Sequence, residues 1–324
     1  MKRKGAWLIG LLILVLGLAA CGRESQTTNH EGVTIVTTIF PEYDWVREIL
    51  GENPADAEVV MLLDNGVDLH SFQPNAQDIM KISTCDLFIY VGGESDEWVN
   101  DALKEAVNPD MIVIDLLDVL GDAVKEEEVI EGMEAEEEDE GEEEGPEYDE
   151  HVWLSLKHAK TFVGEIAQAI ETIDPDHADV YLANASAYQE KLTKLDEAYE
   201  KAVSEAEKKV VLFGDRFPFR YLVDDYGLTY YAAFAGCSAE TEASFETVIF
   251  LAGKADELGL LNICTLESSD GKIAETIRET TSEKNQSIVT FDSMQSTTMQ
   301  DVQAGETYLT IMEKNLEALT QALQ

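Results

Sequence analysis

Short apolar runs alternate with helical patterns along most of this 324-residue chain, and this alternation restricts the fold more than any other feature. From Thr34 onward the order is TIVTTI, YDWVREIL, AEVVML, NAQDIMKI, DLFIYVG, EWVNDALKEAV and MIVIDL. Strands that alternate with helices in this way predict a parallel sheet covered by helices on both faces. Residues 33–175 are therefore expected to form an α/β lobe.

The same alternation restarts after residue 208. The runs VVLFGD, TYYAAF, LNICTLE and SIVTFD are predicted strands separated by helical patterns, so residues 209–324 are expected to form a second α/β lobe. Residues 176–208 hold hardly any helix breaker and predict one connecting helix of roughly 45–50 Å. Two such lobes joined by a long helix leave a cleft between them, where this architecture binds ligands.

The N-terminal residues, MKRKGAWLIGLLILVLGLAAC, predict export. The basic start and the short apolar run are typical of a signal peptide over residues 1–20, and the run is too short for a confident membrane span. Its end, LAAC, resembles a bacterial lipoprotein signal, with an ordinary signal peptide or an anchor helix as alternatives. The resemblance implies a lipidated Cys21, a tether over residues 21–32, and attachment to the outer face of the bacterial cell membrane.

Charge indicates which ligands the chain can bind. It has 66 acidic and 22 basic residues and a formal net charge of −44, whereas nucleic-acid binding needs a basic face. We therefore expect cations and no nucleic acid. Residues 126–150 contain sixteen Asp or Glu and no Lys or Arg, which predicts a disordered acidic loop over about residues 122–149. This loop either attracts cations to the cleft or is a solvating spacer.

Three cysteines remain after Cys21, and none of them has the CxxC spacing of a thiolate zinc site. Cys85, in STCDLFIYVGG, is expected to be a small buried residue at the start of a strand. Cys237 and Cys264 are either free thiols or joined by a disulfide, which an oxidising extracytoplasmic compartment allows.

Two histidines lie where a binding site is expected. His70, in DNGVDLHSFQP, follows the predicted strand AEVVMLL, and the carboxyl ends of parallel strands carry the sites of open sheets. His151, in EYDEHVWL, directly follows the acidic segment. Two neutral imidazoles together with carboxylates would hold a dication with balanced charge.

Five segments together resemble the metal-binding lipoproteins of zinc and manganese ABC importers. GVDLHSFQPNAQDI is similar to that family's GV-x-x-H-x-F-x-P segment and DEHVWLSL to its D-x-HVWL-D segment, while TTIFPEYDWVREI, DLFIYVGG and VTFDSM also fit. The resemblance implies a monomeric, non-enzymatic receptor that captures zinc and delivers it to the importer's membrane permease. The alternatives are a manganese receptor of the same family, a metal-dependent adhesin, and an envelope metallohydrolase, for which the chain lacks an HExxH motif or a nucleophile elbow.

The resemblance also implies metal ligands. It assigns His70 and His151 as nitrogen ligands and Asp292 of VTFDSM as an oxygen ligand at the end of the last strand. Two nitrogens and two oxygens suit zinc, although two carboxylates would also tolerate manganese.

The fourth ligand position departs from the family pattern. The stretch FRYL places Arg216 where the family has His or Glu, and a guanidinium cannot bind a metal ion. Asp215 would serve if the loop carried a one-residue insertion, and Glu267 of TLESS or a water molecule are the alternatives. Arg216 is expected to pair with Asp215 or with another nearby acid.

Overall fold

The computed structural model of the protein describes residues 32–134, 147–238 and 242–324. The predicted signal peptide, Cys21 and nearly all of the tether lie outside these residues, as does the middle of the acidic segment. Within the described ranges, no helix is both long enough and apolar enough to cross a membrane.

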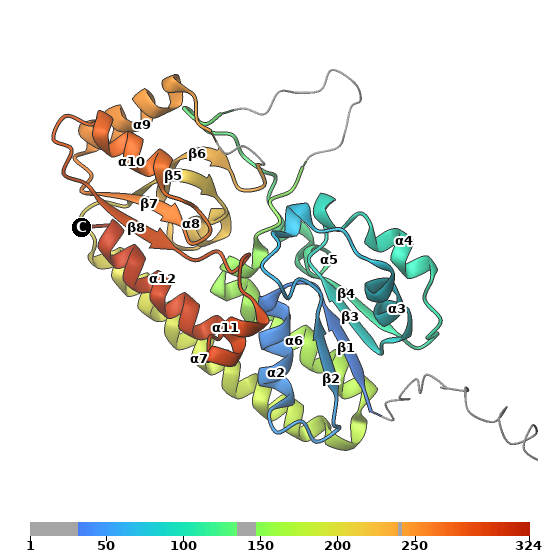
Figure 1. Cartoon of the computed structure of the whole chain (residues 1–324). Helices are drawn as coiled ribbons and strands as arrows, with labels where there is room; N and C mark the ends of the chain where they lie inside the picture. Colours follow the sequence, from blue (N-terminus) through green and yellow to red (C-terminus); the bar gives the residue numbers. More distant parts are fainter. Residues whose placement is uncertain (1–31, 135–146, 239–241) are drawn as a thin grey trace, which may run out of the picture. The chain divides into compact units, whose positions relative to one another are not determined.

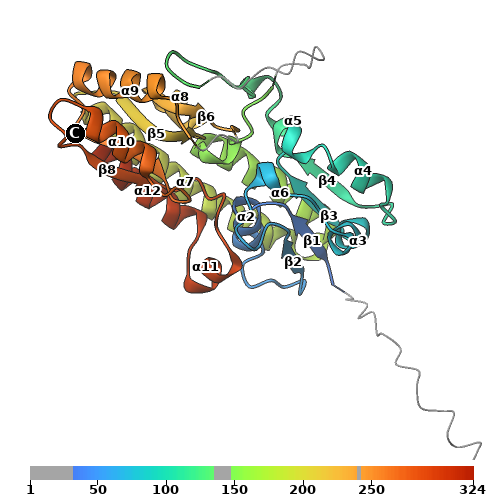
Figure 2. The ribbon, with the colours of Figure 1, turned by 45° about the horizontal axis from the view of Figure 1, so that its top comes forward.

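The first lobe contains a parallel four-stranded sheet in the order β2-β1-β3-β4. Helices α3 and α4 lie on one side of this sheet, and α2 and α6 lie on the other (Figures 1 and 2). This confirms the parallel sheet that the alternating pattern predicts. The elements are β1 (Thr34–Thr37), α2 (Phe40–Leu50), β2 (Glu58–Met61), α3 (Ala76–Thr84), β3 (Leu87–Tyr90), α4 (Val99–Lys104), β4 (Ile112–Asp115), α5 (Leu116–Leu120) and α6 (Leu156–Ile173).

The second lobe contains another parallel four-stranded sheet, in the order β6-β5-β7-β8. Taken in chain order, its strands are arranged as in the first sheet, so the two lobes share one topology without obvious sequence repetition. The elements are β5 (Val210–Phe217), α8 (Arg220–Tyr226), β6 (Thr229–Ala235), α9 (Phe245–Leu258), β7 (Asn262–Leu266), α10 (Lys272–Thr280), β8 (Ser287–Phe291), α11 (Met299–Ala304) and α12 (Tyr308–Ala322).

Helix α7 (Ala178–Glu205) confirms the predicted connecting helix. Its 28 residues give a length of about 42 Å, and it packs against α2 and α6 of the first lobe and against α12 of the second. One apolar stripe of α7 therefore packs against both lobes, because a helix returns to the same face every three or four residues. The buried residues of this stripe include Tyr181, Ala185, Tyr188, Leu192, Leu195, Tyr199 and Val203.

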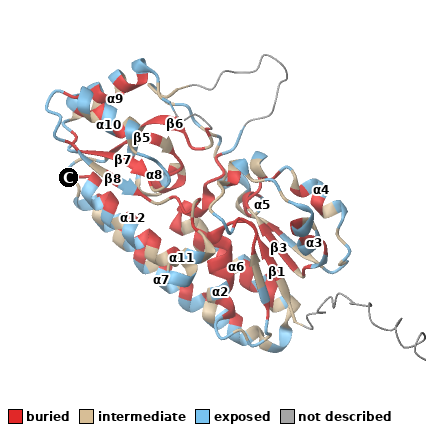
Figure 3. Cartoon of the chain, in the orientation of Figure 1, coloured by how far each residue is buried: buried red, intermediate tan, exposed pale blue. Residues whose placement is uncertain are grey.

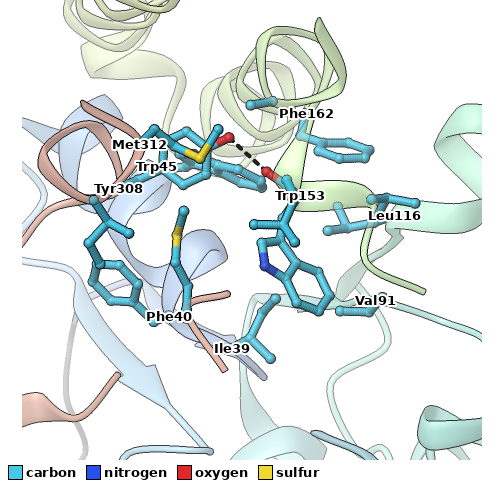
Figure 4. Close-up of a cluster of buried hydrophobic side chains, with 14 of the residues drawn as sticks. Ile39, Phe40, Trp45, Val91, Leu116, Trp153, Phe162, Tyr308 and Met312 are labelled. Atoms are coloured by element: carbon cyan, nitrogen blue, oxygen red, sulfur yellow. Dashed lines mark hydrogen bonds between the residues drawn. The ribbon is translucent and has the colours of Figure 1, made fainter. Parts of the chain in front are cut away.

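Buried aromatic side chains join the two lobes next to the HVWL segment (Figure 4). Trp153, in the short 3-10 helix η4 (Val152–Leu154), donates from Nε1 to the Ser293 carbonyl of the second lobe at 2.9 Å. Tyr308 Oη donates to the Trp153 carbonyl at 2.7 Å, and the Tyr308 ring packs edge-on against Trp45. The buried residues are concentrated on both sheets and at this junction (Figure 3). The segment that carries His151 is thereby fixed to both lobes.

The described ends of the acidic segment hold specific contacts. Glu126 forms an antiparallel bridge with Tyr148, and Glu128 pairs with Arg220 of α8. Individual carboxylates of these ends are bound by an arginine or by a backbone N–H group. Residues 135–146 of the segment lie outside the described residues.

The three described cysteines are free thiols, so Cys237 and Cys264 form no disulfide. Cys264 lies in β7 and Cys237 lies just after β6, and β5 separates these two strands. Neighbouring strands are about 4.8 Å apart, so residues two strands away exceed the ~7 Å between Cα atoms that a disulfide can span. Cys85 is buried as expected, at the C-cap of α3 and two residues before β3 begins.

Candidate metal centre

The imidazoles of His70 and His151 face each other, with their Nε2 atoms 3.3 Å apart. Zinc binds imidazole nitrogen at about 2.0–2.1 Å with tetrahedral geometry, so two nitrogen ligands of one ion lie roughly 3.3–3.4 Å apart. The two side chains therefore already have the spacing of two ligands of a single ion. The two histidines are 81 residues apart in the sequence, and this spacing gives no indication that they lie close together.

His70 is held by the loop that follows β2. It lies in the 3-10 helix η1 (Leu69–Ser71), whose N-cap Asp68 accepts a hydrogen bond from the His70 backbone N–H at 3.1 Å. Its Nδ1 lies 2.7 Å from Ser95 Oγ and 3.4 Å from Glu150 Oε2. Although burial disfavours the charged ring, Glu150 and Asp68 raise the pKa of His70 above its ordinary value. These contacts direct Nε2 towards His151.

His151 is fully buried and is oriented by a carboxylate. Asp149 Oδ1 accepts from the His151 backbone N–H at 2.9 Å and lies 3.0 Å from the ring Nδ1. The Asp149 carbonyl in turn accepts from Tyr221 Oη of the second lobe at 2.8 Å. A carboxylate on Nδ1 of a metal-binding histidine holds the proton on that nitrogen and leaves Nε2 as the ligand atom, which is the arrangement that His151 would have with an ion bound.

Cys237 completes a triad with the two histidines. One ligand atom of each residue, the Cys237 Sγ and a ring nitrogen of each histidine, lies within 4.8 Å of the others. Cys237 follows β6, and its backbone N–H donates to Glu127 Oε1 at 2.9 Å. Burial and the nearby Glu127 carboxylate raise the pKa of the Cys237 thiol well above its ordinary value. A bound dication would reverse this effect, because a coordinated thiol ionises.

Asp68, Gln295 and Arg216 border the triad. One end of the Gln295 amide lies 2.8 Å from His151 Nε2, and the other end lies 2.8 and 3.0 Å from the two Asp68 oxygens. A carboxylate only accepts hydrogen bonds, so the amide nitrogen faces Asp68 and the amide oxygen faces His151. Arg216 pairs with Asp68 at 2.9 Å instead of with the Asp215 carboxylate.

The structure places Asp215 in a hydrogen-bond network of the second sheet. Its Oδ2 accepts from Thr265 Oγ1 at 2.7 Å and from Leu266 N–H at 3.1 Å, which ties β5 to β7. Its Oδ1 accepts from the backbone N–H of Arg216 at 3.0 Å. Both oxygens are thus engaged by donors within the lobe.

Asp292 and Glu267 lie beside each other at the ends of β8 and β7. Asp292 Oδ1 accepts from the Met294 N–H at 2.8 Å, whereas Glu267 accepts from Ser293 and Ser296. Burial, followed by the charge of Glu267, raises the pKa of Asp292 to about 7. Neither carboxylate belongs to the triad that the described residues bring within 4.8 Å.

The sequence pattern singles out the two histidines but not Cys237, Gln295 or Asp68, which the structure places beside them. Cys237 carried a usable signal, because AGCS directly follows the predicted strand TYYAAF, and the same position after a strand singled out His70. Gln295 carried no such signal, since a neutral amide residue near a strand end forms no distinctive sequence pattern.

The family model described as zinc-uptake complex component A, periplasmic, matches residues 35–322. The zinc-binding lipoprotein AdcA of Streptococcus pneumoniae is 31% identical over 312 residues, which are 95% of this chain and 59% of that protein. The chain thus spans little more than half the length of this relative. The high-affinity zinc uptake system protein ZnuA of Bacillus subtilis is 29% identical over 330 residues, covering 100% of this chain and 99% of that protein.

A solved structure with the same fold is the Zn(II)-bound ZnuA-like domain of S. pneumoniae AdcA. It superposes with a TM-score of 0.70 at 29% identity, covering 90% of this chain and 99% of that domain. The likeness therefore includes both lobes of the described structure.

Proposed function

This chain belongs to the zinc-uptake complex component A family, and we propose that it is an extracytoplasmic receptor that binds one zinc ion between its lobes and delivers it to the permease of an ABC importer. The observation that carries the proposal is the triad of His70, His151 and Cys237, with two Nε2 atoms already 3.3 Å apart. Membership in a family of uptake-complex components argues against the metallohydrolase alternative.

The donor set supports zinc as the cargo in preference to manganese. Thiolate is a soft ligand that suits zinc, whereas manganese prefers carboxylate, carbonyl and water oxygens. Two imidazoles and one thiolate also match the ligand types of tetrahedral zinc sites. We therefore expect zinc to bind much more tightly than manganese in direct competition.

Attachment to the membrane is the second part of the proposal. It rests on the LAAC sequence that ends at Cys21 and on the AdcA relative, which is itself named a lipoprotein. Incorporation of a radiolabelled fatty acid into the expressed protein, and its loss in Cys21→Ala, would test the anchor.

The metal-binding part is tested by Cys237→Ser, His70→Ala and His151→Ala, with Cys85→Ser as the matched control. Cys85 is buried away from the triad and its Sγ contacts the Ile82 carbonyl, which a serine hydroxyl can also reach. We expect each histidine variant to lose at least tenfold in zinc affinity in a chelator competition titration. An even share of the ~10–16 kcal/mol typical of four-ligand zinc sites predicts a loss of roughly a hundredfold to a thousandfold for Cys237→Ser.

Cobalt(II) provides the spectroscopic test of the thiolate. The parent protein and Cys85→Ser should show a thiolate-to-cobalt charge-transfer band in the near ultraviolet, and Cys237→Ser should lack it. An unchanged band in Cys237→Ser would remove Cys237 from the site.

Delivery requires a cellular test. A strain without the gene should grow poorly in zinc-limited medium, and the parent gene, but not Cys237→Ser, should restore growth. Normal growth of the deletion strain would favour the adhesin alternative.

A further inference from the structure

Asp68 links the two lobes at the edge of the metal centre. Its Oδ2 accepts a hydrogen bond from Arg216 at 2.9 Å, and its two oxygens lie 2.8 and 3.0 Å from the Gln295 amide nitrogen. Arg216 and Gln295 belong to the second lobe, whereas Asp68 caps η1 in the first. The carboxylate is therefore held in one orientation by donors from both lobes.

The other oxygen of Asp68 lies close to the metal centre. Its Oδ1 is 4.0 Å from His70 Nε2 and also accepts from the His70 backbone N–H at 3.1 Å, so it would bind a metal ion in addition to this cap contact. In a tetrahedral zinc site, nitrogen and oxygen ligands lie about 3.4 Å apart, so this oxygen is roughly 0.6 Å beyond ligand distance from His70. Asp68 lies outside the group of ligand atoms within 4.8 Å of one another, so metal binding must also draw its carboxylate towards the rest of the triad. His70, His151 and Cys237 supply three of the four ligands that such a site needs.

We propose that Asp68 supplies the fourth zinc ligand through Oδ1 and that Arg216 orients this carboxylate through Oδ2. The inference rests on the proposed function, because it concerns the same zinc ion. A carboxylate can bind a metal with one oxygen and accept a hydrogen bond with the other, and carboxylates that bind metals are commonly held in this way. The arrangement accounts for a permanently charged arginine so near a dication, since the carboxylate lies between the two cations.

Charge favours Asp68 over Gln295 as the oxygen ligand. Two neutral imidazoles and one thiolate leave a charge of +1 on a zinc site, and a carboxylate cancels it. The amide oxygen of Gln295 would leave this charge facing Arg216. Gln295 is then a second positioning residue, which donates its amide N–H to Asp68.

The test compares Asp68→Asn, Arg216→Gln and the double variant with Asp64→Asn as the control. Asp64 is an exposed residue of the same loop, so its substitution removes the same charge without touching the centre. Asparagine caps helices as well as aspartate does, so Asp68→Asn keeps the η1 cap. The readouts are zinc affinity by chelator competition and the visible d–d absorption of the cobalt(II) form, which reports the ligand set.

We expect Asp68→Asn to bind zinc at least tenfold more weakly than Asp64→Asn and to shift the cobalt d–d bands. Arg216→Gln should cause a smaller loss, and the double variant should not recover, because the missing oxygen donor is still missing. Parent-like affinity in the double variant would mean that Asp68 only screens Arg216, and would overturn the inference. An Asp68→Asn protein indistinguishable from Asp64→Asn in zinc affinity and in the cobalt d–d bands would also overturn it. Absence of zinc binding by the parent protein would refute the proposed function itself.

Discussion

Gly236 offers the most direct test of how closely the second lobe must approach His151. A Cβ atom at this position would lie 3.0 Å from His151 Cε1, 3.0 Å from His151 Nδ1 and 3.0 Å from the Phe217 carbonyl oxygen. Ordinary van der Waals contacts of a Cβ begin at 3.4 Å, so Gly236→Ala requires a displacement of about 0.4 Å. The ring or the loop carrying Cys237 must move, because the Phe217 carbonyl belongs to β5.

This displacement exceeds what the metal centre tolerates. Metal–ligand distances hold within about 0.2 Å, and the His151 Nδ1 contact to Asp149 at 3.0 Å would lengthen as the ring recedes. Disturbing such an orienting contact typically lowers metal affinity roughly 10–100-fold. We expect a loss of this size for zinc in Gly236→Ala, measured by competition with a chromophoric chelator.

Gly253→Ala is the matched control, because a Cβ at Gly253 of α9 meets no atom within 4 Å. Thermal unfolding in the presence of a chelator should show both variants folded, with Gly236→Ala less stable by about 1–3 kcal/mol from overpacking. If Gly236→Ala bound zinc within threefold of the parent, the close approach of the Cys237 loop to His151 would not limit the site.

Three further perturbations separate the fold from the site. Burial raises the pKa of Asp44 from 3.8 to about 6, so its contribution to folding stability is present below pH 4 and is lost as the pH rises through 6. Asn cannot ionise, so the unfolding free energy of metal-free Asp44→Asn should rise relative to that of the parent by about 3 kcal/mol between pH 4 and pH 7. Denaturant titrations at the two pH values measure this difference, and a difference that does not change with pH would contradict the expectation. Asp215→Asn should lower the unfolding free energy by about 1–3 kcal/mol, because the amide nitrogen would face the hydrogen-bond donors of β7. Its zinc affinity should change less than threefold. A tenfold loss of zinc affinity without loss of stability would restore Asp215 as a ligand. Residues 135–146 carry eight Asp or Glu, and deleting them should leave zinc affinity at physiological salt within a few-fold of the parent. Stopped-flow measurements should show slower zinc capture by the deletion variant at low ionic strength. If the variant and the parent captured zinc at equal rates at both low and physiological salt, the segment would have no role in capture.

The local pattern of the chain was enough to determine its architecture. Strand and helix periodicity depend on consecutive residues, so the alternating runs predict both parallel sheets, and the breaker-free stretch predicts α7. The same local reasoning found His70 and His151, because each lies in a distinctive segment next to a strand end or the acidic segment. Composition alone sufficed to expect cations as ligands.

Only the tertiary structure decided which other residues accompany the histidines. A ligand atom must come within a few ångströms of its partners, and that distance depends on how the lobes pack and not on any spacing along the chain. Cys237 reaches the histidines because the loop after β6 meets the HVWL segment across the junction. Asp215 has the same sequence signal as a ligand, a carboxylate near a strand end, yet both its oxygens bind donors of its own sheet. The sequence cannot distinguish a free carboxylate from an engaged one, because two of the Asp215 donors, Thr265 and Leu266, lie 50 and 51 residues away and meet it only after folding.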